Sequence, residues 1–261
     1  MCIMYKEIIR LFSRDTAFRL LKWNLKLIDK VPFAKSFIKF RYKFERKSLR
    51  RELFNLSFDN PIGIGPGLDK DASYYRPLTA YGFSFVDIGP LGSDTILQAL
   101  SRLKADDPET NVSICIEKDH VRCFTLAYDF ADMFVFNIKD DRITEVMDKI
   151  LETRLTYDAY RPVLVRISHS MPEDDLHYIL DYCMLNGIDG VVVATSENVA
   201  IVHKYTNGRL PIIGYGGIRS YEQARDMLSA GASLIEITTG LVLDGPSLAN
   251  VILKQLENNK L

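Results

Sequence analysis

The stretch Pro211-Ile-Ile-Gly-Tyr-Gly-Gly-Ile-Arg-Ser220 contains the unit from which the fold is predicted. A short apolar run ends in glycines, and a polar segment with helical spacing follows. Ser220 and Gln223 form a capping box, which is typical of a helix start. A continuous apolar run that leads into a helix indicates a strand of a parallel sheet with helices on both faces. This stretch therefore predicts one strand–helix unit.

The same unit occurs eight times after residue 60, with starts 22 to 29 residues apart. The apolar runs are Ile62–Gly65, Phe85–Ile88, Val112–Ile116, Phe134–Ile138, Val163–Ile167, Gly190–Ala194, Ile212–Gly214 and Leu234–Thr238. Eight evenly spaced units predict a closed (β/α)8 TIM barrel, and the 261 residues suit that fold. An open doubly wound sheet is the structural alternative.

The composition, 47% apolar and 26% charged, indicates an ordinary soluble globular domain. No apolar window approaches the roughly 18 residues of a membrane-spanning helix. Lys6, Glu7 and Arg10 interrupt any secretory signal. The four cysteines form no C-x-x-C pair and the four histidines have no ligand spacing, so we expect reduced thiols, no metal site and a cytoplasmic location.

Residues 1–52 are strongly basic, with 15 lysines and arginines against five acids, whereas residues 53–261 carry a net charge of −11. Apolar residues at helical spacing run through this segment and predict two or three amphipathic helices, broken near Val31–Pro32. We therefore divide the chain into a helical segment, 1–52, and a barrel, 53–261. The segment either rests on an anionic membrane surface or packs as a cap on the acidic body. No nucleic-acid motif accompanies the charge, so no nucleic-acid partner is expected.

In barrels of this kind the active site lies at the carboxyl ends of the strands. After the last two predicted strands come Gly216 and Gly217, then Thr239 and Gly240. Glycines let backbone N–H groups approach an anion closely, and these two loops are the usual phosphate site of the fold. The sequence predicts a phosphate ligand here; the alternative is that the glycines only permit a tight turn.

Three other strand ends carry candidate polar groups. Lys70, in the loop that begins at Gly65 and Pro66, can stabilise negative charge, or it can pair with a neighbouring aspartate. Asn137 can read a planar polar ligand, and Asp140 can be a general base or only start the next helix. Arg166 lies inward among apolar neighbours, and we expect it to contact a ligand rather than a structural partner.

The chain resembles the dihydroorotate dehydrogenases over nearly its whole length. Asn60–Asp71 and Tyr81–Gly89 are similar to the family's first two barrel units, and Gly208–Ile218 and Ala230–Gly240 to the last two. The basic N-terminal segment is similar to that of the quinone-using, membrane-associated class. The resemblance implies an FMN flavoprotein that oxidises dihydroorotate to orotate in pyrimidine biosynthesis. It implies transfer of electrons to a quinone through residues 1–52, and a peripheral position on the cytoplasmic face of the inner membrane.

The resemblance also implies roles for individual residues. Asp140 and Lys70 would be catalytic, and Lys70, Asn137 and Ser196 would bind substrate. The cofactor would be held by Gly65, Pro66, Lys70, Arg166, Gly216, Gly217, Thr239 and Gly240.

The chain departs from the family at several of these positions. It reads Asn137-Ile-Lys-Asp-Asp-Arg142 where the family reads Asn-Ile-Ser-Ser-Pro-Asn, so Asp140 takes the position of a serine base. Arg166 replaces a lysine, Ser196 replaces an asparagine, and a stretch after the second strand is absent. Each lost buried hydrogen bond costs about 1–3 kcal/mol. The alternatives are a non-catalytic paralogue that binds FMN, another phosphate ligand or a protein partner, and a barrel enzyme that uses Asp140 and Arg166 on another small substrate.

Overall fold

The computed structural model describes residues 9, 12–103, 110–137 and 142–259. Eight parallel strands form one sheet in the order β3-β10-β9-β8-β7-β6-β5-β4. They are β3 (Ile62–Gly63), β4 (Phe85–Leu91), β5 (Asn111–Ile116), β6 (Met133–Phe136), β7 (Val163–Arg166), β8 (Gly190–Ala194), β9 (Ile212–Tyr215) and β10 (Leu234–Glu236). The parallel bridge between Ile64 and Val86 joins β3 to β4. The predicted closed (β/α)8 barrel is therefore confirmed.

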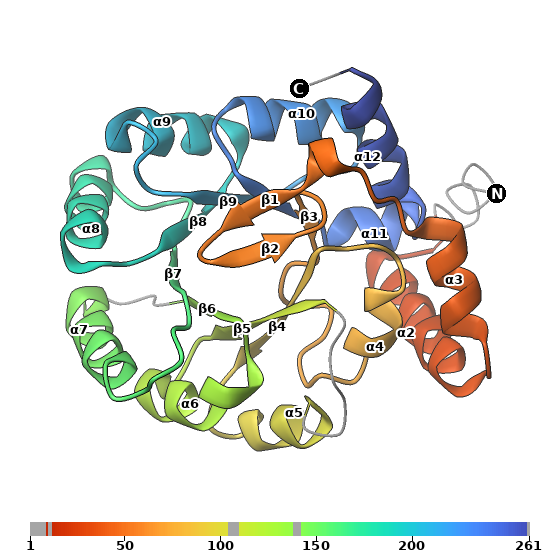
Figure 1. The fold of residues 1–261 in the computed structure, drawn as a ribbon, viewed down its shortest axis with the longest axis horizontal. Coiled ribbons are helices and arrows are strands. Elements are labelled where there is room, and N and C mark those ends of the chain that lie inside the picture. Colours follow the sequence, from red (N-terminus) through yellow and green to blue (C-terminus); the bar gives the residue numbers. More distant parts are fainter. Residues whose placement is uncertain (1–8, 10–11, 104–109, 138–141, 260–261) are drawn as a thin grey trace.

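Helices surround the sheet and follow the strands in turn (Figure 1). They are α4 (Tyr75–Thr79), α5 (Ile96–Leu103), α6 (His120–Ala127), α7 (Ile143–Arg154), α8 (Glu173–Asn186), α9 (Ser196–Thr206), α10 (Tyr221–Ser229), α11 (Thr239–Asp244) and α12 (Leu248–Asn258). Ser220 caps α10 as predicted, because its hydroxyl accepts a hydrogen bond from the Gln223 N–H. The amide oxygen of Gln223 accepts from the N–H of Arg219, so the capping box closes one residue earlier than usual.

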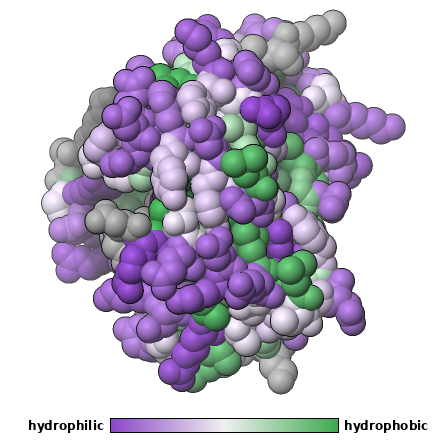
Figure 2. Space-filling view, turned by 90° about the vertical axis from the view of Figure 1, so that its left-hand side faces the viewer, coloured by the Kyte–Doolittle hydropathy of each residue, from purple (hydrophilic) through white to green (hydrophobic). Residues whose placement is uncertain are grey.

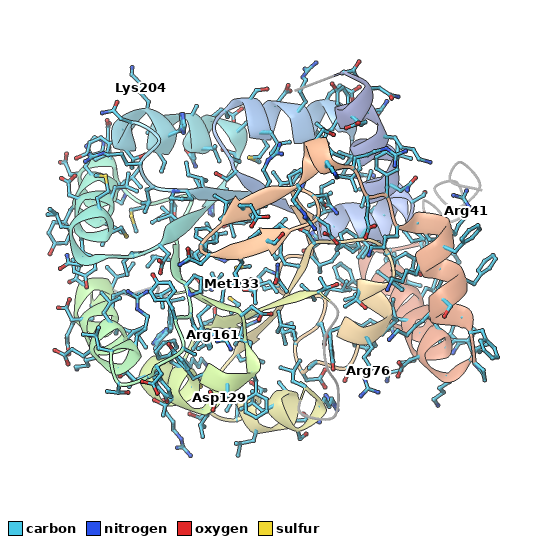
Figure 3. The ribbon with its side chains drawn as sticks, viewed as in Figure 1. Arg41, Arg76, Asp129, Met133, Arg161 and Lys204 are labelled. Atoms are coloured by element: carbon cyan, nitrogen blue, oxygen red, sulfur yellow. The ribbon has the colours of Figure 1, made fainter. Side chains whose placement is uncertain are left out.

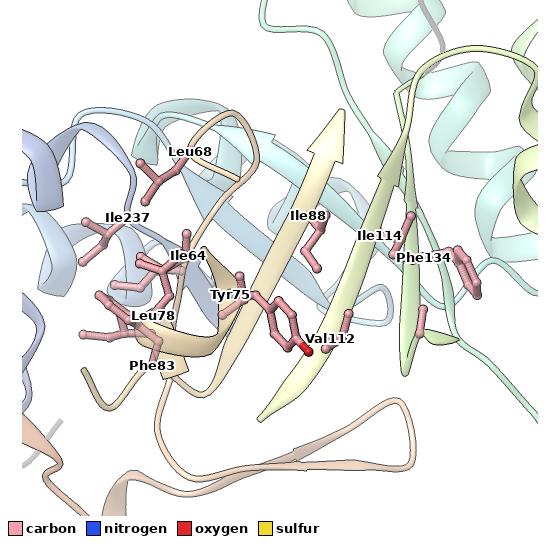
Figure 4. Packing of buried hydrophobic residues seen from close by; sticks show 14 of the residues in the cluster. Ile64, Leu68, Tyr75, Leu78, Phe83, Ile88, Val112, Ile114, Phe134 and Ile237 are labelled. Atoms are coloured by element: carbon pink, nitrogen blue, oxygen red, sulfur yellow. The ribbon is translucent and has the colours of Figure 1, made fainter. Parts of the chain in front are cut away.

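Two apolar layers hold the barrel together. The layer between sheet and helices includes Ile88, Val112, Ile114 and Phe134, which point away from the barrel axis (Figure 4). The second layer fills the inside of the barrel, where Met133 lies near the centre of the view in Figure 3. Because successive residues of a strand face opposite sides, each strand contributes to both layers.

A short hairpin, which the sequence patterns did not reveal, packs against the barrel interior. Its strands β1 (Arg51–Leu53) and β2 (Leu56–Phe58) pair in antiparallel register. Phe58 is fully buried and meets the ring of Phe85 edge-on, at 5.8 Å between centroids. The predicted domain boundary between residues 52 and 53 falls inside β1.

The basic N-terminal segment forms helices α2 (Arg14–Lys30) and α3 (Ala34–Tyr42), with the predicted break at Val31. The hydroxyl of Ser13 caps α2 by accepting a hydrogen bond from the Thr16 N–H. The helix α2 lies beside α4 and α11, and α3 lies beside α2 (Figure 1). The helix α2 buries Ala17, Leu21 and Leu25, which share one face.

Large apolar side chains remain exposed on these two helices and on the turn between them. Phe33 and Phe40 are 86% and 89% exposed, and the exposed cation Arg41 projects from α3 (Figure 3). The face of the molecule over α7 and α8 is mostly hydrophilic (Figure 2). Among the described residues, no helix combines the length and apolar character needed to cross a bilayer.

Candidate functional site

A pocket of about 340 Å³ lies where several strands end. It lies among the loops that follow β3, β9 and β10, the end of β7 and the first turns of α2. Seven of the residues predicted for the site line it together: Pro66, Lys70, Arg166, Gly216, Gly217, Thr239 and Gly240. A few convergent polar groups in such a concave space are typical of a small-molecule site.

The two glycine loops form one continuous wall of this pocket. Gly216 and Gly217 have φ of +99° and +72°, and no atom lies within 4 Å of the position that a Gly217 side chain would take. Within the described residues, the N–H groups of these two glycines donate to no protein acceptor. A side chain at Gly240 would lie 2.3 Å from the carbonyl oxygen of Ile218. Glycine therefore lets α11 start directly against the loop after β9.

An ion pair fixes the same two loops to each other. The guanidinium of Arg219, which follows the loop after β9, donates hydrogen bonds of 2.7 and 3.1 Å to the carboxylate of Asp244 at the end of α11. Asp244 is buried, and its hydrogen bonds raise the pKa of Arg219. Two parallel bonds of this kind restrain direction as well as distance. The wall is therefore held by a pair outside the pocket lining.

Hydrogen bonds around two neighbouring aspartates hold the loop of Lys70. The buried carboxylate of Asp69 accepts from the N–H groups of Ser73 and Tyr74 at 2.9 and 2.8 Å. Burial raises the pKa of Asp69. Asp71 pairs with Arg102. In the described part of the chain, Lys70 therefore pairs with neither aspartate, and it faces the pocket as an uncompensated cation.

Arg166 has partners that the sequence reasoning did not identify. Its Nη2 lies 3.1 Å from Oε2 of Glu236 and 3.4 Å from Oδ2 of Asp87, and all three side chains are buried inside the barrel. Its guanidinium also lies over the ring of Tyr215, at 4.6 Å. We expected Arg166 to contact a ligand and no structural partner. This expectation is corrected in part, because Arg166 forms structural ion pairs and also lines the pocket.

The sequence does contain a pattern that predicts the two acidic partners of Arg166. Asp87 and Glu236 each interrupt an apolar run at an inward-facing position, as Arg166 does. Burial and the charge of Glu236 raise the pKa of Asp87 to about 8, although Arg166 opposes this shift. One oxygen of Asp87 and the Nε of Arg166 are buried without a hydrogen-bond partner among the described residues.

The remaining predicted residues lie outside the lining of this pocket or outside the described residues. The amide of Asn137 donates to Oε1 of Glu117 at 3.2 Å. Ser196 is the first residue of α9. Gly65 adjoins the pocket, and a side chain there would lie 2.7 Å from Oε2 of Glu236, so close packing favours glycine at this position. Asp140 lies outside the described residues.

Two lining residues come from α2 and were not predicted. Arg14 and Phe18 lie one helical turn apart and both face the pocket. Nη2 of Arg14 donates to the hydroxyl of Thr239 at 3.1 Å, across a sequence separation of 225 residues. No local pattern reports a contact over this separation.

A second, larger pocket lies between α2, α3 and α12. It measures about 920 Å³, and its lining is mainly apolar, with Leu21, Ile28 and Phe37 as examples. Its charged lining residues, among those described, are the cations Arg41 and Lys254. It shares no lining residue with the first pocket.

Comparison with known proteins points to one family by sequence and to one fold by structure. A family model described as dihydroorotate dehydrogenase matches residues 137–259. A dihydroorotate dehydrogenase (quinone) of Christiangramia forsetii is 26% identical, with 94% of this chain and 96% of that protein covered. The enzyme of the same name from Hamiltonella defensa is 25% identical, with 78% and 86% covered.

These matches support membership of the dihydroorotate dehydrogenase family. The alignment with the Christiangramia forsetii protein spans 329 positions, more than the 261 residues of this chain, so that family member contains residues that this one lacks. Among solved structures, the ligand-free DHODH of Eimeria tenella superposes with a TM-score of 0.82 and 17% identity, with 95% and 96% of the two chains covered. At this identity the match shows a shared fold.

Proposed function

We propose that this family member binds FMN in the 340 Å³ pocket and oxidises dihydroorotate to orotate in pyrimidine biosynthesis. The observation that carries the proposal is the convergence of the two glycine loops, Lys70 and Arg166 on one pocket. These groups come from four different strand ends, and only closure of the barrel brings them together.

The groups in this pocket fit FMN. The free N–H groups of Gly216 and Gly217 and the open space beside Gly217 suit a phosphate. Pro66 also lines this pocket and offers an apolar surface to a planar ring. The unpartnered Nε of Arg166 leaves a buried donor available for a polar atom of that ring.

The residues then divide the chemistry of the reaction between them. When bound, FMN supplies the acceptor for the hydride that leaves C6 of dihydroorotate. Lys70 holds the anionic substrate and stabilises charge that develops during the reaction. Asn137 and Ser196 bind the polar edge of the substrate ring. Asp140 takes the proton from C5, since it stands at the base position of the family's motif.

We further propose that a quinone enters through the 920 Å³ pocket. This pocket is mainly apolar and lies between the two N-terminal helices and α12. Two of the similar proteins carry the word quinone in their names. The exposed aromatic side chains of these helices, together with their lysines and arginines, suit peripheral contact with an anionic membrane, on the cytoplasmic face of the inner membrane.

A second candidate function is FMN binding without catalysis. It is favoured by the amide of Asn137, which is bonded to Glu117 and lies outside the lining of the pocket. The altered motif Asn137–Arg142 favours the same alternative. A protein partner in place of dihydroorotate would be the corresponding ligand.

The two candidates are separated by mixing FMN-loaded protein with dihydroorotate in the absence of oxygen. The enzyme predicts rapid loss of the visible flavin absorption and formation of orotate. We expect Lys70→Ala and Asp140→Asn to slow this step by about 10²-fold or more, whereas Lys149→Ala, an exposed change on α7, should leave it unchanged. Loaded protein that dihydroorotate never bleaches would establish the non-catalytic candidate.

A further inference from the structure

Arg14 is a cation that the N-terminal helical segment contributes to a barrel pocket. It is the first residue of α2 and lies on the exposed side of that helix, yet its guanidinium reaches Thr239 at the start of α11. The Nη2–Oγ1 distance is 3.1 Å. The contact therefore joins the helical segment to the loop that follows the last barrel strand.

The place of this contact within the pocket is specific. Thr239 adjoins Gly240, which packs against the carbonyl oxygen of Ile218 in the other glycine loop. The guanidinium of Arg14 consequently lies at the glycine wall, and Phe18, one turn later on α2, lines the same pocket. One face of α2 thus presents a cation and an apolar ring to the ligand space.

Arg14 has no acidic partner among the described residues that line the pocket. Arg166 is already paired with Glu236 and Asp87. Arg14 forms no ion pair with any acid among the described residues, and its hydrogen bond to Thr239 engages a neutral hydroxyl. A guanidinium has five donors, so several remain available for an anion. Arginine suits a phosphate in particular, because its planar fork matches two phosphate oxygens.

We propose that Arg14 binds the phosphate of the ligand held by the glycine loops. The inference rests on the proposed FMN binding and adds to it a charged contact from outside the barrel, next to the glycine wall. Arg14 selects the phosphorylated ligand over the same ring without phosphate. The helical segment thereby becomes part of the cofactor site.

The test compares equilibrium binding of FMN and riboflavin, which differ by the phosphate, to the full-length protein freed of flavin. Four proteins are titrated by flavin fluorescence: wild type, Arg14→Gln, Arg14→Lys and Arg19→Gln. Arg19 lies on the same helix and outside the pocket lining. Its substitution therefore removes the same charge from the helix without changing the pocket. Circular dichroism verifies that all four proteins contain the same helix content.

We expect Arg14→Gln to weaken FMN binding about tenfold and to leave riboflavin binding unchanged. Arg14→Lys should retain most of the FMN affinity, and Arg19→Gln all of it. Equal FMN affinity of Arg14→Gln and Arg19→Gln would overturn the proposal. An equal loss of FMN and riboflavin affinity would also overturn it, because Arg14 would then act on the shape of the pocket.

Failure of the proposed function has a different signature. Wild-type protein that takes up neither flavin would refute FMN binding itself. Arg14 is then tested with inorganic phosphate by calorimetry. Weaker phosphate binding by Arg14→Gln than by Arg19→Gln would sustain the assignment, and equal binding, or none by wild type, would refute it.

Discussion

Arg166 of β7 and Glu236 of β10 form an ion pair inside the barrel, with 3.1 Å between Nη2 and Oε2. Asp87 of β4 adds a second carboxylate at 3.4 Å from the same nitrogen. One cation thus faces two acids in a space with little water. Coulombic attraction is strong there, and the loss of the cation is correspondingly costly. This cluster separates the apolar interior of the barrel from the pocket above it.

Replacement of Arg166 by methionine should destabilise the protein. The change leaves Asp87 and Glu236 buried together without a cation, and we expect the free energy of unfolding to fall by about 3 kcal/mol. Urea unfolding followed by circular dichroism measures it. The matched variant Glu236→Gln leaves Arg166 paired with Asp87 and should cost much less. Equal losses in the two variants would contradict this account of the cluster.

The pH dependence of stability should bear the signature of Asp87. Because the pKa of Asp87 is raised to about 8 in the folded protein, the folded state keeps a proton that the unfolded chain has released. The stabilisation that Asp87 contributes is fully present below its ordinary pKa, near 4. It is lost as the pH rises from there to about 8. We therefore expect the unfolding free energy to decrease between about pH 5 and 8.

The variant Asp87→Asn isolates that contribution. Since asparagine does not titrate, the downward slope of the unfolding free energy should be smaller in this variant than in wild type. Urea unfolding at a series of pH values measures both slopes. Parallel slopes would show that Asp87 does not hold the proton.

The pair between Arg219 and Asp244 should support both stability and ligand binding. Asp244→Asn removes the charge of a buried partner that accepts two hydrogen bonds, and we expect a loss of about 1 to 2 kcal/mol in unfolding free energy. FMN affinity should fall as well, because the glycine wall loses its restraint. Arg225→Gln is the control, since its pair with Asp226 is exposed and should contribute within about 0.5 kcal/mol. If Arg225→Gln lowered the unfolding free energy as much as Asp244→Asn does, the pair between Arg219 and Asp244 would have no special role.

Sequence patterns predicted the barrel because its signals are local. Each predicted strand run, such as Phe85–Ile88 or Gly190–Ala194, matches a strand of the sheet to within a few residues. The break at Val31 was also visible, because a proline follows it. The hairpin was missed because each of its strands has only three residues, too few to show a period.

The candidate site also has a part that the sequence predicts and a part that it does not. Glycines and Lys70 stand directly after strands, so the fold predicts where they meet. The partnership of Arg166 with Asp87 and Glu236 depends on which strands become neighbours across the barrel. The contact of Arg14 with Thr239 depends on how α2 packs against the barrel. The spacing of apolar residues in the sequence does not predict that packing.

Membrane association should depend on the exposed aromatic residues of the N-terminal segment. Phe33→Ser together with Phe40→Ser removes two side chains that are almost fully exposed, and we expect binding to anionic vesicles to fall about tenfold or more. Sedimentation with vesicles measures it. The control is Leu155→Ser with Leu185→Ser, at 84% and 83% exposure, which lie just after α7 and on α8. A similar loss in both double variants would indicate general stickiness and no defined membrane surface.

FMN binding in the pocket formed by the two glycine loops, Lys70 and Arg166 can be measured on the purified protein. The 261-residue protein is titrated with FMN, free flavin is removed, and the visible absorption spectrum is recorded. We predict saturable uptake approaching one FMN per chain, which Gly217→Val should abolish because the new side chain would occupy the open space beside the loop and strain its backbone. A wild-type protein that remains colourless at saturating FMN would contradict this prediction.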